Sequence, residues 1–269
     1  MPKNILILGE NGYLGSKILE HLKNEYSIYF LTKDQILEFY SIGNIDNETY
    51  FDCIINCFIK YDDNLSSMIE SNFHLPIKIC EKIKKTKNFK IFHFDSFYSK
   101  FFNLAPYNKY LLSKKNLLDW TNIFHNENPG YTTFILRLEH LIGSNESESK
   151  FNAWLIRELK SNNKIELSKS KHKLDFIYVN DLIDLIKILI EGNSFEGEYK
   201  ILEVGSGINH SIEEFAEMIK SKLFSKSKIL YTKKLELYKT QTSIAKNQNL
   251  IKLGWKPIQN FEEILDKIL

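Results

Sequence analysis

Arginine is almost absent from this sequence, which limits the partners that its surface can bind. Of its 36 basic residues only Arg137 and Arg157 are arginines, and the formal net charge of the 269-residue chain is +2. Specific nucleic-acid contacts are made largely by arginine side chains on strongly basic surfaces. The composition therefore argues against a nucleic-acid partner and against attraction to an acidic membrane surface.

Cysteine and long hydrophobic runs are also scarce. The three cysteines, Cys53, Cys57 and Cys80, include no Cys-x-x-Cys pair, so we expect neither a disulfide framework nor a zinc site. No apolar run reaches the length of a transmembrane helix. A strand-like segment begins at Asn4, which leaves no room for a signal peptide. We expect a cytoplasmic protein that binds no metal and no membrane.

What the sequence does contain is a glycine-rich turn near its start. The segment Gly9-Glu-Asn-Gly12-Tyr-Leu-Gly15 follows the apolar run Asn4–Leu8 and precedes a helical pattern. The first glycine allows a tight turn, the second a close approach to phosphate groups, and the third close packing of helix on strand. The free N–H groups at the helix start would receive a pyrophosphate. We predict a dinucleotide-binding loop made of Gly9, Asn11, Gly12, Tyr13, Leu14 and Gly15.

Strand-like and helix-like segments alternate along the first half of the chain. The alternation predicts an α/β fold, a Rossmann-type doubly wound parallel sheet with helices on both faces. Pro76 lies inside one helical pattern and should kink or divide that helix. The expected strands are Asn4–Leu8, Ser27–Leu31, Cys53–Cys57, Lys90–Phe94 and Thr132–Leu138, and the expected helices are Tyr13–Asn24, Leu65–Lys84 and Tyr107–His125.

After Gly143 the alternation loosens, and the pattern indicates a smaller C-terminal lobe. Residues 151–161 and 180–191 look helical, and a capping box of Ser211 and Glu214 predicts a helix over Ile212–Lys222. We expect a Rossmann domain over residues 1–143, to which residues 174–191 return, and a lobe made mainly of residues 144–269.

A tyrosine and a lysine four residues apart carry the predicted chemistry. Tyr110 and Lys114 fall on one face of the expected helix, downstream of a strand that ends at Asp95-Ser96. A lysine ammonium beside a phenol lowers the pKa of the tyrosine, which suits it for proton transfer near neutral pH. The alternative is an ordinary surface pair, because this spacing is common. The glycine loop upstream favours the catalytic interpretation.

With these elements the chain resembles the extended short-chain dehydrogenase/reductase family, whose members act on nucleotide-activated sugars. Thr132–Gly143 resembles the family's Leu-Arg-x-x-Asn-x-x-Gly strand, with His140 in place of the usual asparagine. Leu174–Asp181 resembles its Arg-Asp-Phe-Val-Tyr-Val-x-Asp motif, with Leu174 in place of the arginine. Two further likenesses are the turn Glu203–Gly207 and the closing segment Leu253–Pro257.

The resemblance implies roles for individual residues. Ser96 would hydrogen-bond the keto oxygen of the sugar, Tyr110 would be the acid, and Lys114 would lower its pKa and hold the nicotinamide ribose. The alternative for Phe58 and His140 is a position in the core, and the alternative for Lys171 and Lys173 is a position in a charged surface loop. The implied cofactor contacts are Asn56, Phe58, Asn72, Tyr110, Lys114 and His140, and the implied substrate contacts are Ser96, Phe97, Tyr98, Lys171, Lys173, Asp175 and Lys239. The C-terminal lobe would bind the nucleotide sugar, and two helices would pair in a homodimer.

Within the family the chain is most similar to the branch that reduces the 4-keto group of CDP-activated 3,6-dideoxyhexoses for surface polysaccharides. Phe97 and Tyr98 follow Ser96, where dehydratases carry an Asp-Glu pair, so we do not expect a 4,6-dehydratase. Two alternatives stay open. One is an NAD-dependent nucleotide-sugar 4-epimerase, and the other is a non-catalytic NAD(P)-binding regulatory protein of the same fold.

The end of the second expected strand bears on the choice of cofactor. NAD-dependent Rossmann proteins place an acid there to bind the ribose 2′-hydroxyl. This chain has Thr32 and Lys33, whose hydroxyl and ammonium suit a 2′-phosphate better. We therefore expect NADP(H), which favours net reduction. NAD(H) stays possible if Asp34 binds the ribose and Lys33 is a solvated lysine.

Overall fold

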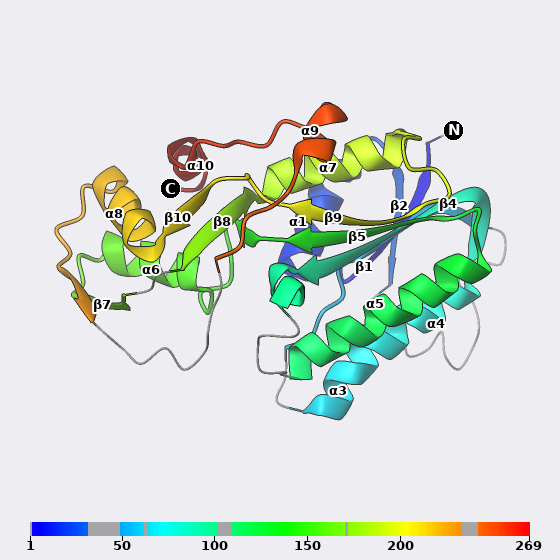
Figure 1. Ribbon diagram of the computed structural model, residues 1–269, viewed down its shortest axis with the longest axis horizontal. Coiled ribbons are helices and arrows are strands. Elements are labelled where there is room, and N and C mark those ends of the chain that lie inside the picture. Colours follow the sequence, from blue (N-terminus) through cyan, green and yellow to red (C-terminus); the bar gives the residue numbers. More distant parts are fainter. Residues whose placement is uncertain (1, 32–48, 62–63, 102–108, 170–171, 233–241) are drawn as a thin grey trace. The chain divides into compact units, whose positions relative to one another are not determined.

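The computed structural model describes residues 2–31, 49–61, 64–101, 109–169, 172–232 and 242–269 (Figure 1). The chain divides into two compact units. The first takes in Met1–Phe102, Tyr107–Arg137 and Ile186–Leu202. The second takes in Leu138–Leu185 and Glu203–Leu269. Each unit is described by itself.

The first unit is built on a six-stranded sheet in the order β2-β1-β3-β4-β5-β9. The pairs β1–β2, β1–β3 and β3–β4 are parallel, which confirms the predicted α/β fold. Strand order reverses at β1, and in open α/β sheets ligands bind at the carboxyl ends of the strands beside such a point. The strands are β1 (Asn4–Leu8), β2 (Ser27–Leu31), β3 (Tyr50–Asn56), β4 (Lys84–Ser96), β5 (Thr132–Leu138) and β9 (Tyr199–Val204).

Apolar runs explain why the central strands form. Ile5, Ile7, Ile55 and Phe92 have no exposed surface, and their neighbours along β1, β3 and β4 are almost as deeply buried. Because successive side chains point to opposite faces, strands buried on both faces read as continuous hydrophobic runs. β4 is longer than expected because its polar start continues the ladder, with Lys84 and Lys85 paired to Tyr50 and Phe51 of β3.

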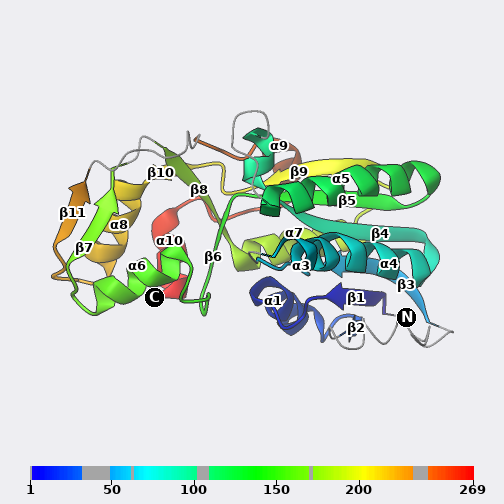
Figure 2. The same cartoon turned by 90° about the horizontal axis from the view of Figure 1, so that it is seen from below.

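Helices cover this sheet. Both views place α3 (Leu65–Ile69) and α4 (Leu75–Lys82) end to end, with α5 (Lys109–Glu127) alongside them (Figure 1 and Figure 2). The helix expected over Leu65–Lys84 is not divided into separate helices at Pro76, because the backbone stays helical from Leu65 to Lys82 and the Leu75 amide donates to the Glu70 carbonyl. A π-helical turn, Glu70–His74, precedes α4. The first unit also contains α1 (Tyr13–Leu22) and, from Ile186 on, the second half of α7 (Val179–Glu191).

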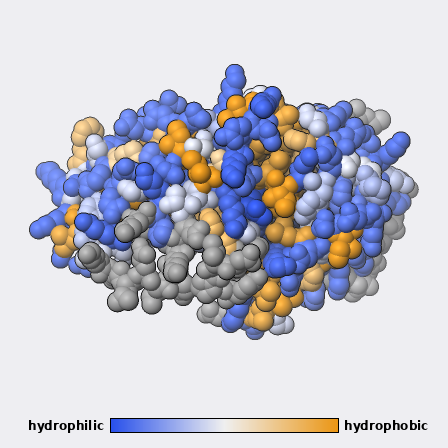
Figure 3. Space-filling view, in the orientation of Figure 1, coloured by the Kyte–Doolittle hydropathy of each residue, from blue (hydrophilic) through white to orange (hydrophobic). Residues whose placement is uncertain are grey.

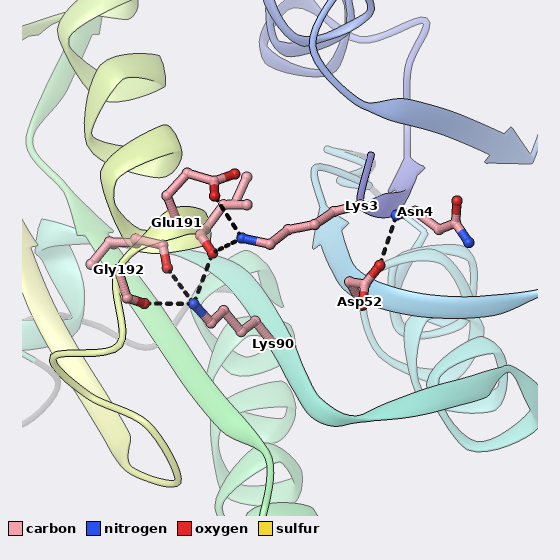
Figure 4. A network of polar contacts seen from close by, with 8 residues as sticks. Lys3, Asn4, Asp52, Lys90, Glu191 and Gly192 are labelled. Atoms are coloured by element: carbon pink, nitrogen blue, oxygen red, sulfur yellow. Dashed lines mark hydrogen bonds and ion pairs between the residues drawn. The ribbon is translucent and has the colours of Figure 1, made fainter. Parts of the chain in front are cut away.

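A buried lysine holds the end of α7 against the sheet. The Nζ of Lys90, on β4, donates to the carbonyl oxygens of Leu189, Ile190 and Gly192 at 3.0, 2.8 and 2.6 Å (Figure 4). Lys3 donates to the Ile190 carbonyl and to the Glu191 carboxylate. The last carbonyls of a helix have no intrahelical partner and carry negative partial charge, so cations stabilise them.

Among its described residues, the second unit contains two small sheets, four whole helices and the first half of α7. Its core includes Phe176, Phe215 and Phe261, whose ring centroids lie 4.6 to 5.2 Å apart. The expected capping box is confirmed, because Ser211 and Glu214 bond each other's backbone amides at the start of α8. The strands are β6 (His140–Ile142), β7 (Ile165–Ser168), β8 (Lys173–Tyr178), β10 (Asn209–Ser211) and β11 (Ile229–Thr232), and the helices are α6 (Phe151–Lys160), α8 (Ile212–Lys222), α9 (Gln248–Lys252) and α10 (Phe261–Ile268).

Within the described residues, no helix has the length and hydropathy needed to cross a membrane. The same residues contain no group of His, Cys, Asp and Glu side chains that could hold a metal ion. All three cysteines are free thiols, and burial raises the pKa of each above its usual range.

Candidate functional site

The loop after β1 is packed so closely that Gly9 and Gly15 have no space for side chains. Gly9 has a φ of +82°, and a Cβ there would lie 2.9 Å from the backbone of Phe58. The Gly12 amide donates to the Gly9 carbonyl at 3.0 Å. A Cβ on Gly15 would lie 2.1 Å from that same carbonyl oxygen. The loop is therefore a tight turn that keeps α1 against β1.

The start of α1 fits the pyrophosphate of NAD or NADP. Gly12 is the N-cap and has no side chain to occupy the first-turn amides, and no acidic residue stands in the first turn. A helix N-terminus with its positive dipole end is a ready anion site. Asn11 turns to the side, where its Nδ2 donates to Glu10 at 2.8 Å. Gly12, Tyr13, Leu14 and Gly15 form the helix start as predicted.

The end of β3 lies beside this loop, and the cofactor contacts implied for Asn56 and Phe58 stay predictions. Asn56 pairs with Leu8 across the β1–β3 ladder. Its Oδ1 accepts the Phe58 amide at 3.1 Å, and its Nδ2 lies 3.0 Å from Nδ1 of His93 on β4. The Asn56 side chain therefore fixes the turn against which Gly9 packs.

Asn72 has a structural role that the sequence did not indicate. It is buried in the π-helical turn, where its Oδ1 accepts the Lys60 amide at 2.6 Å. Its Nδ2 donates to the Lys60 carbonyl and to Ser113 on α5. These three bonds occupy the amide, so Asn72 joins the segment after β3 to α5, and its implied cofactor contact stays a proposal.

The three implied catalytic residues lie on two neighbouring elements of the first unit. Ser96 ends β4, and Tyr110 and Lys114 lie one turn apart on α5. The Lys114 Nζ donates to the Phe94 carbonyl of β4 at 2.5 Å and lies 5.9 Å from the centroid of the Tyr110 ring. The Tyr110 ring packs against that of Tyr61, with centroids 5.2 Å apart. Lys114 thus ties the helix to the strand end that carries Ser96.

The protonation behaviour of this pair differs from the expectation. Burial, followed by the negative charge of Asp95 and the neighbouring Tyr61, raises the pKa of Tyr110 above its usual range. Burial lowers the pKa of Lys114 to about 8, against opposing contributions from Asp95 and Cys57. The lysine was expected to lower the pKa of the tyrosine. Its ammonium is instead bonded to a backbone carbonyl, and burial dominates at the phenol.

Phe97 and Tyr98 follow Ser96 in a short 3₁₀ turn, Phe97–Phe101. Phe97 is buried and stacks on Tyr98, which is 39% exposed. The Tyr98 amide donates to the Ser96 Oγ at 3.3 Å. Tyr98 thus offers an aromatic surface next to Ser96, whereas Phe97 is mainly a core residue.

Sequence reasoning missed a buried ion pair beside Ser96. Asp95 accepts from Nε of Arg137, on β5, at 2.8 Å. The sequence signal was an acidic residue in an otherwise apolar strand end, directly before Ser96. On the same strand, Nδ1 of His93 lies 3.0 Å from Nδ2 of Asn56, which is a structural contact.

Three implied site residues belong to the second unit. Asp175 on β8 is fully buried and accepts four hydrogen bonds, from the Ser206 amide and hydroxyl and from the amides of Gly207 and Ala245. It therefore holds two backbone segments together and has no oxygen exposed to a substrate. His140 lies 3.3 Å from the Asp175 carbonyl, and burial lowers its pKa to about 4. Lys173 is exposed at the start of β8.

Four implied site residues lie outside the described residues. They are Thr32 and Lys33, which bear on the cofactor, and Lys171 and Lys239, which were implied to contact the substrate.

Comparison with known proteins gives relatives along the whole chain. CDP-abequose synthase of Salmonella muenchen is 28% identical over 99% of this chain and 97% of its own length. The CDP-abequose synthase of Salmonella typhimurium is 25% identical over 100% and 98%.

Solved structures share the fold at lower sequence identity. RMD from Pseudomonas aeruginosa, complexed with NADPH, has a TM-score of 0.81 at 17% identity and covers 99% of this chain and 98% of its own. UDP-glucose 4-epimerase from Thermotoga maritima has a TM-score of 0.80 at 15% identity and covers 97% of this chain and 96% of its own.

Residues 5–205 match the family described as the NAD dependent epimerase/dehydratase family. The glycine loop, the Tyr110–Lys114 helix and this match together show that the chain belongs to the NAD dependent epimerase/dehydratase family.

Proposed function

We propose that this protein is an NADPH-dependent reductase of the 4-keto group of a nucleotide-activated deoxysugar, of the kind CDP-4-keto-3,6-dideoxyhexose, in the synthesis of surface polysaccharide. Two relatives that match nearly the whole chain are named CDP-abequose synthase. A dTDP-4-dehydro-6-deoxyglucose reductase of Escherichia coli matches over 36% of the chain at 26% identity. These names support a nucleotide-sugar substrate.

The observation that carries the proposal is the Tyr110–Lys114 pair fastened to β4. The bond from Lys114 to the Phe94 carbonyl holds α5 against the strand that ends at Ser96. A bound NADPH would supply the hydride that reaches C4 of the sugar. Tyr110 then donates its phenolic proton to the oxygen that develops negative charge, and the Ser96 hydroxyl donates a hydrogen bond to that oxygen. The Lys114 ammonium binds the ribose next to the nicotinamide.

Burial raises the pKa of Tyr110, so the phenol carries the proton that a reductase must donate. An epimerase uses the same tyrosine, whose phenolate accepts a proton in one half-reaction and returns it in the other.

The residues after Ser96 argue against a dehydratase. Phe97 and Tyr98 offer no carboxylate to move a proton and expel a hydroxyl group. Asp95 is the nearest carboxylate to Ser96 in the chain, and it is already bonded to Arg137 and Ser99.

The choice of NADPH rests on Thr32 and Lys33 in the sequence, since an ammonium next to the ribose favours a 2′-phosphate over a 2′-hydroxyl.

We also propose that the protein is a homodimer that pairs through α3 and α5. Apolar side chains reach the surface over α3, as Figure 3 shows, and Leu65 is 37% exposed there. On α5, Leu112 is 37% and Ile123 is 56% exposed. Pairing of these helices with a second copy would remove that apolar surface from water.

The decisive experiment incubates the purified protein with NADPH and a panel of CDP-, dTDP- and UDP-linked 4-keto sugars. Loss of absorbance at the NADPH band should occur with a CDP-linked 4-keto-deoxysugar, and mass spectrometry should identify a product two hydrogens heavier. The same panel with NADH tests the cofactor. Interconversion of 4-hydroxy sugars with no net consumption of NADPH or NADH would instead identify an epimerase. A strong preference for NADH would overturn the choice of NADPH.

A further inference from the structure

A buried ion pair lies one residue from Ser96, and neither partner belongs to the catalytic set proposed above. The side chain of Asp95 is 1% exposed and that of Arg137 is 16% exposed. One carboxylate oxygen of Asp95 accepts from Arg137 Nε at 2.8 Å, and the other accepts from the Ser99 hydroxyl at 2.6 Å. Burial of two charges costs free energy, so the pair is weak evidence for stability and invites another explanation.

The pair belongs to a run of consecutive anchored residues at the end of β4. The Phe94 carbonyl accepts from Lys114 of α5. The next residue, Asp95, is bonded to Arg137 of β5 and to Ser99 of the following turn. Ser96 comes directly afterwards. Its backbone is therefore preceded by contacts with α5 and β5 and followed by a turn that the same carboxylate holds.

We propose that Asp95 is a positioning residue of this site: its carboxylate, held by Arg137 and Ser99, fixes the chain around Ser96 and keeps a buried negative charge near the Tyr110–Lys114 pair. This proposal rests on the proposed function, because it assigns Asp95 a task in the same reduction. The charge favours the ammonium form of Lys114 and disfavours the phenolate form of Tyr110. Both are the protonation states that the reduction needs.

Electrostatic interactions agree with this arrangement. Asp95 acts on Lys114 to raise its pKa against the stronger effect of burial, and it raises the pKa of Tyr110. At Tyr199, Asp95 and Arg137 act in opposite directions, which shows that the arginine offsets part of the field of the carboxylate.

Two described neighbours of the pair, Cys57 and His93, contribute no charge at neutral pH. Burial keeps the Cys57 thiol protonated and lowers the pKa of His93 to about 3, so both are neutral. Among the described residues, the titratable groups that interact with the pair or with Asp95 include His93 from β4, Cys57 and Tyr61 from the segment at and after the end of β3, Arg137 from β5 and Tyr199 from β9.

The first test follows the titration of Lys114 and needs neither substrate nor cofactor. Lysine labelled with 13C at Cε gives an NMR signal that shifts as the amine loses its proton, and Lys114→Arg identifies the signal by its loss. In the wild-type protein this signal should titrate near pH 8. In Asp95→Asn, a nearly isosteric change that removes the charge, the transition should move to lower pH by about half a unit or more.

Two further variants separate charge from structure. Arg137→Gln leaves the carboxylate without its cation, so the Lys114 transition should move to higher pH, opposite to Asp95→Asn. Ser99→Ala removes one hydrogen bond from the same carboxylate but no charge, so the transition should stay in place. Arg137→Gln also keeps the test open if Asp95→Asn does not fold, which circular dichroism would reveal.

The second test is the pH profile of the reduction. The alkaline limb of kcat/KM should move to lower pH in Asp95→Asn and to higher pH in Arg137→Gln, and Asp95→Glu should restore the wild-type limb. A merely structural role would lower the rate or the unfolding midpoint without moving the limb. Shifts of the Lys114 titration in the same direction for both charge variants, or no shift, would overturn the proposal. Because that titration requires no turnover, lack of any reductase activity would count against the proposed function alone.

Discussion

At the scale of single residues, position 15 has no space for a side chain. A Cβ on Gly15 would lie 2.1 Å from the Gly9 carbonyl oxygen, far inside contact distance. Gly15→Ala must therefore push α1 away from the turn and move the amides that would bind the pyrophosphate. We expect the affinity for NADPH to fall about 10- to 100-fold, which corresponds to the cost of overpacking. Fluorescence titration with NADPH measures this.

Gly130→Ala is the matched control for that change. A Cβ on Gly130 would meet its nearest atom at 3.8 Å, an ordinary contact, so NADPH should bind with unchanged affinity. Wild-type affinity in Gly15→Ala would contradict the assignment of this loop.

Tyr110→Phe should separate chemistry from binding. The change removes the proposed acid and keeps the ring, so the rate of reduction should fall by about 10²- to 10⁴-fold while the Kd for NADPH stays the same. Tyr61→Phe serves as the control, because it removes a hydroxyl from the ring packed against Tyr110 and leaves the acid in place. Turnover by Tyr110→Phe at the wild-type rate would rule out this role.

The pKa of Lys114 predicts how activity depends on pH. Burial lowers that pKa to about 8, so the ammonium is present below pH 8 and is lost as the pH rises through this value. Reduction should therefore decline above pH 8 in a profile of kcat/KM. Lys114→Arg keeps its charge throughout this range. Any activity that this variant retains should show no decline near pH 8. If the variant declined as the wild-type protein does, the loss of activity above pH 8 would belong to another group.

At the scale of elements, the end of α7 depends on Lys90. Lys90→Met leaves three carbonyl groups without their buried donor, and we expect the free energy of unfolding to fall by about 1–3 kcal/mol in urea titrations. Lys3→Met removes a more exposed lysine from the same helix end and should cost about 0–1 kcal/mol. If the two changes lowered the free energy of unfolding equally, burial would not be the reason that Lys90 stabilises this helix end.

Local patterns explain which elements could be predicted. The strands Asn4–Leu8, Ser27–Leu31 and Thr132–Leu138 have the expected bounds because they are short apolar runs between turns. β9 and the short strands of the second unit were not predicted, because their partners lie far away in the sequence. β10, for example, is three residues long and forms only by pairing with β8.

The same distinction holds for the candidate site. The glycine loop and the Tyr110–Lys114 pair could be predicted because their residues are within one turn of each other in the chain. The Asp95–Arg137 pair joins residues 42 positions apart, so no local spacing reveals it. The pKa of Tyr110 could not be predicted for a related reason: it depends on burial, and burial follows from the whole fold.

At the scale of the whole molecule, the proposed homodimer makes a prediction about mass. Light scattering should give twice the mass of one chain, because pairing would cover the apolar side chains of α3 and α5. Ile123→Lys places a charge on this surface and should yield monomers. Ile251→Lys changes an equally apolar residue on α9, 41% exposed, and should leave the dimer intact. A wild-type protein with the mass of a single chain would reject the proposal.

The contact between Asn56 and His93 determines which nitrogen of the His93 ring carries the proton. Because Asn56 Oδ1 is committed to the Phe58 amide, its NH₂ group must donate to His93 Nδ1. That assignment selects one tautomer of the imidazole, with its proton on Nε2. With a pKa of about 3, the ring keeps this tautomer throughout the range in which enzymes work. The histidine is therefore a neutral dipole of fixed orientation beside Lys114.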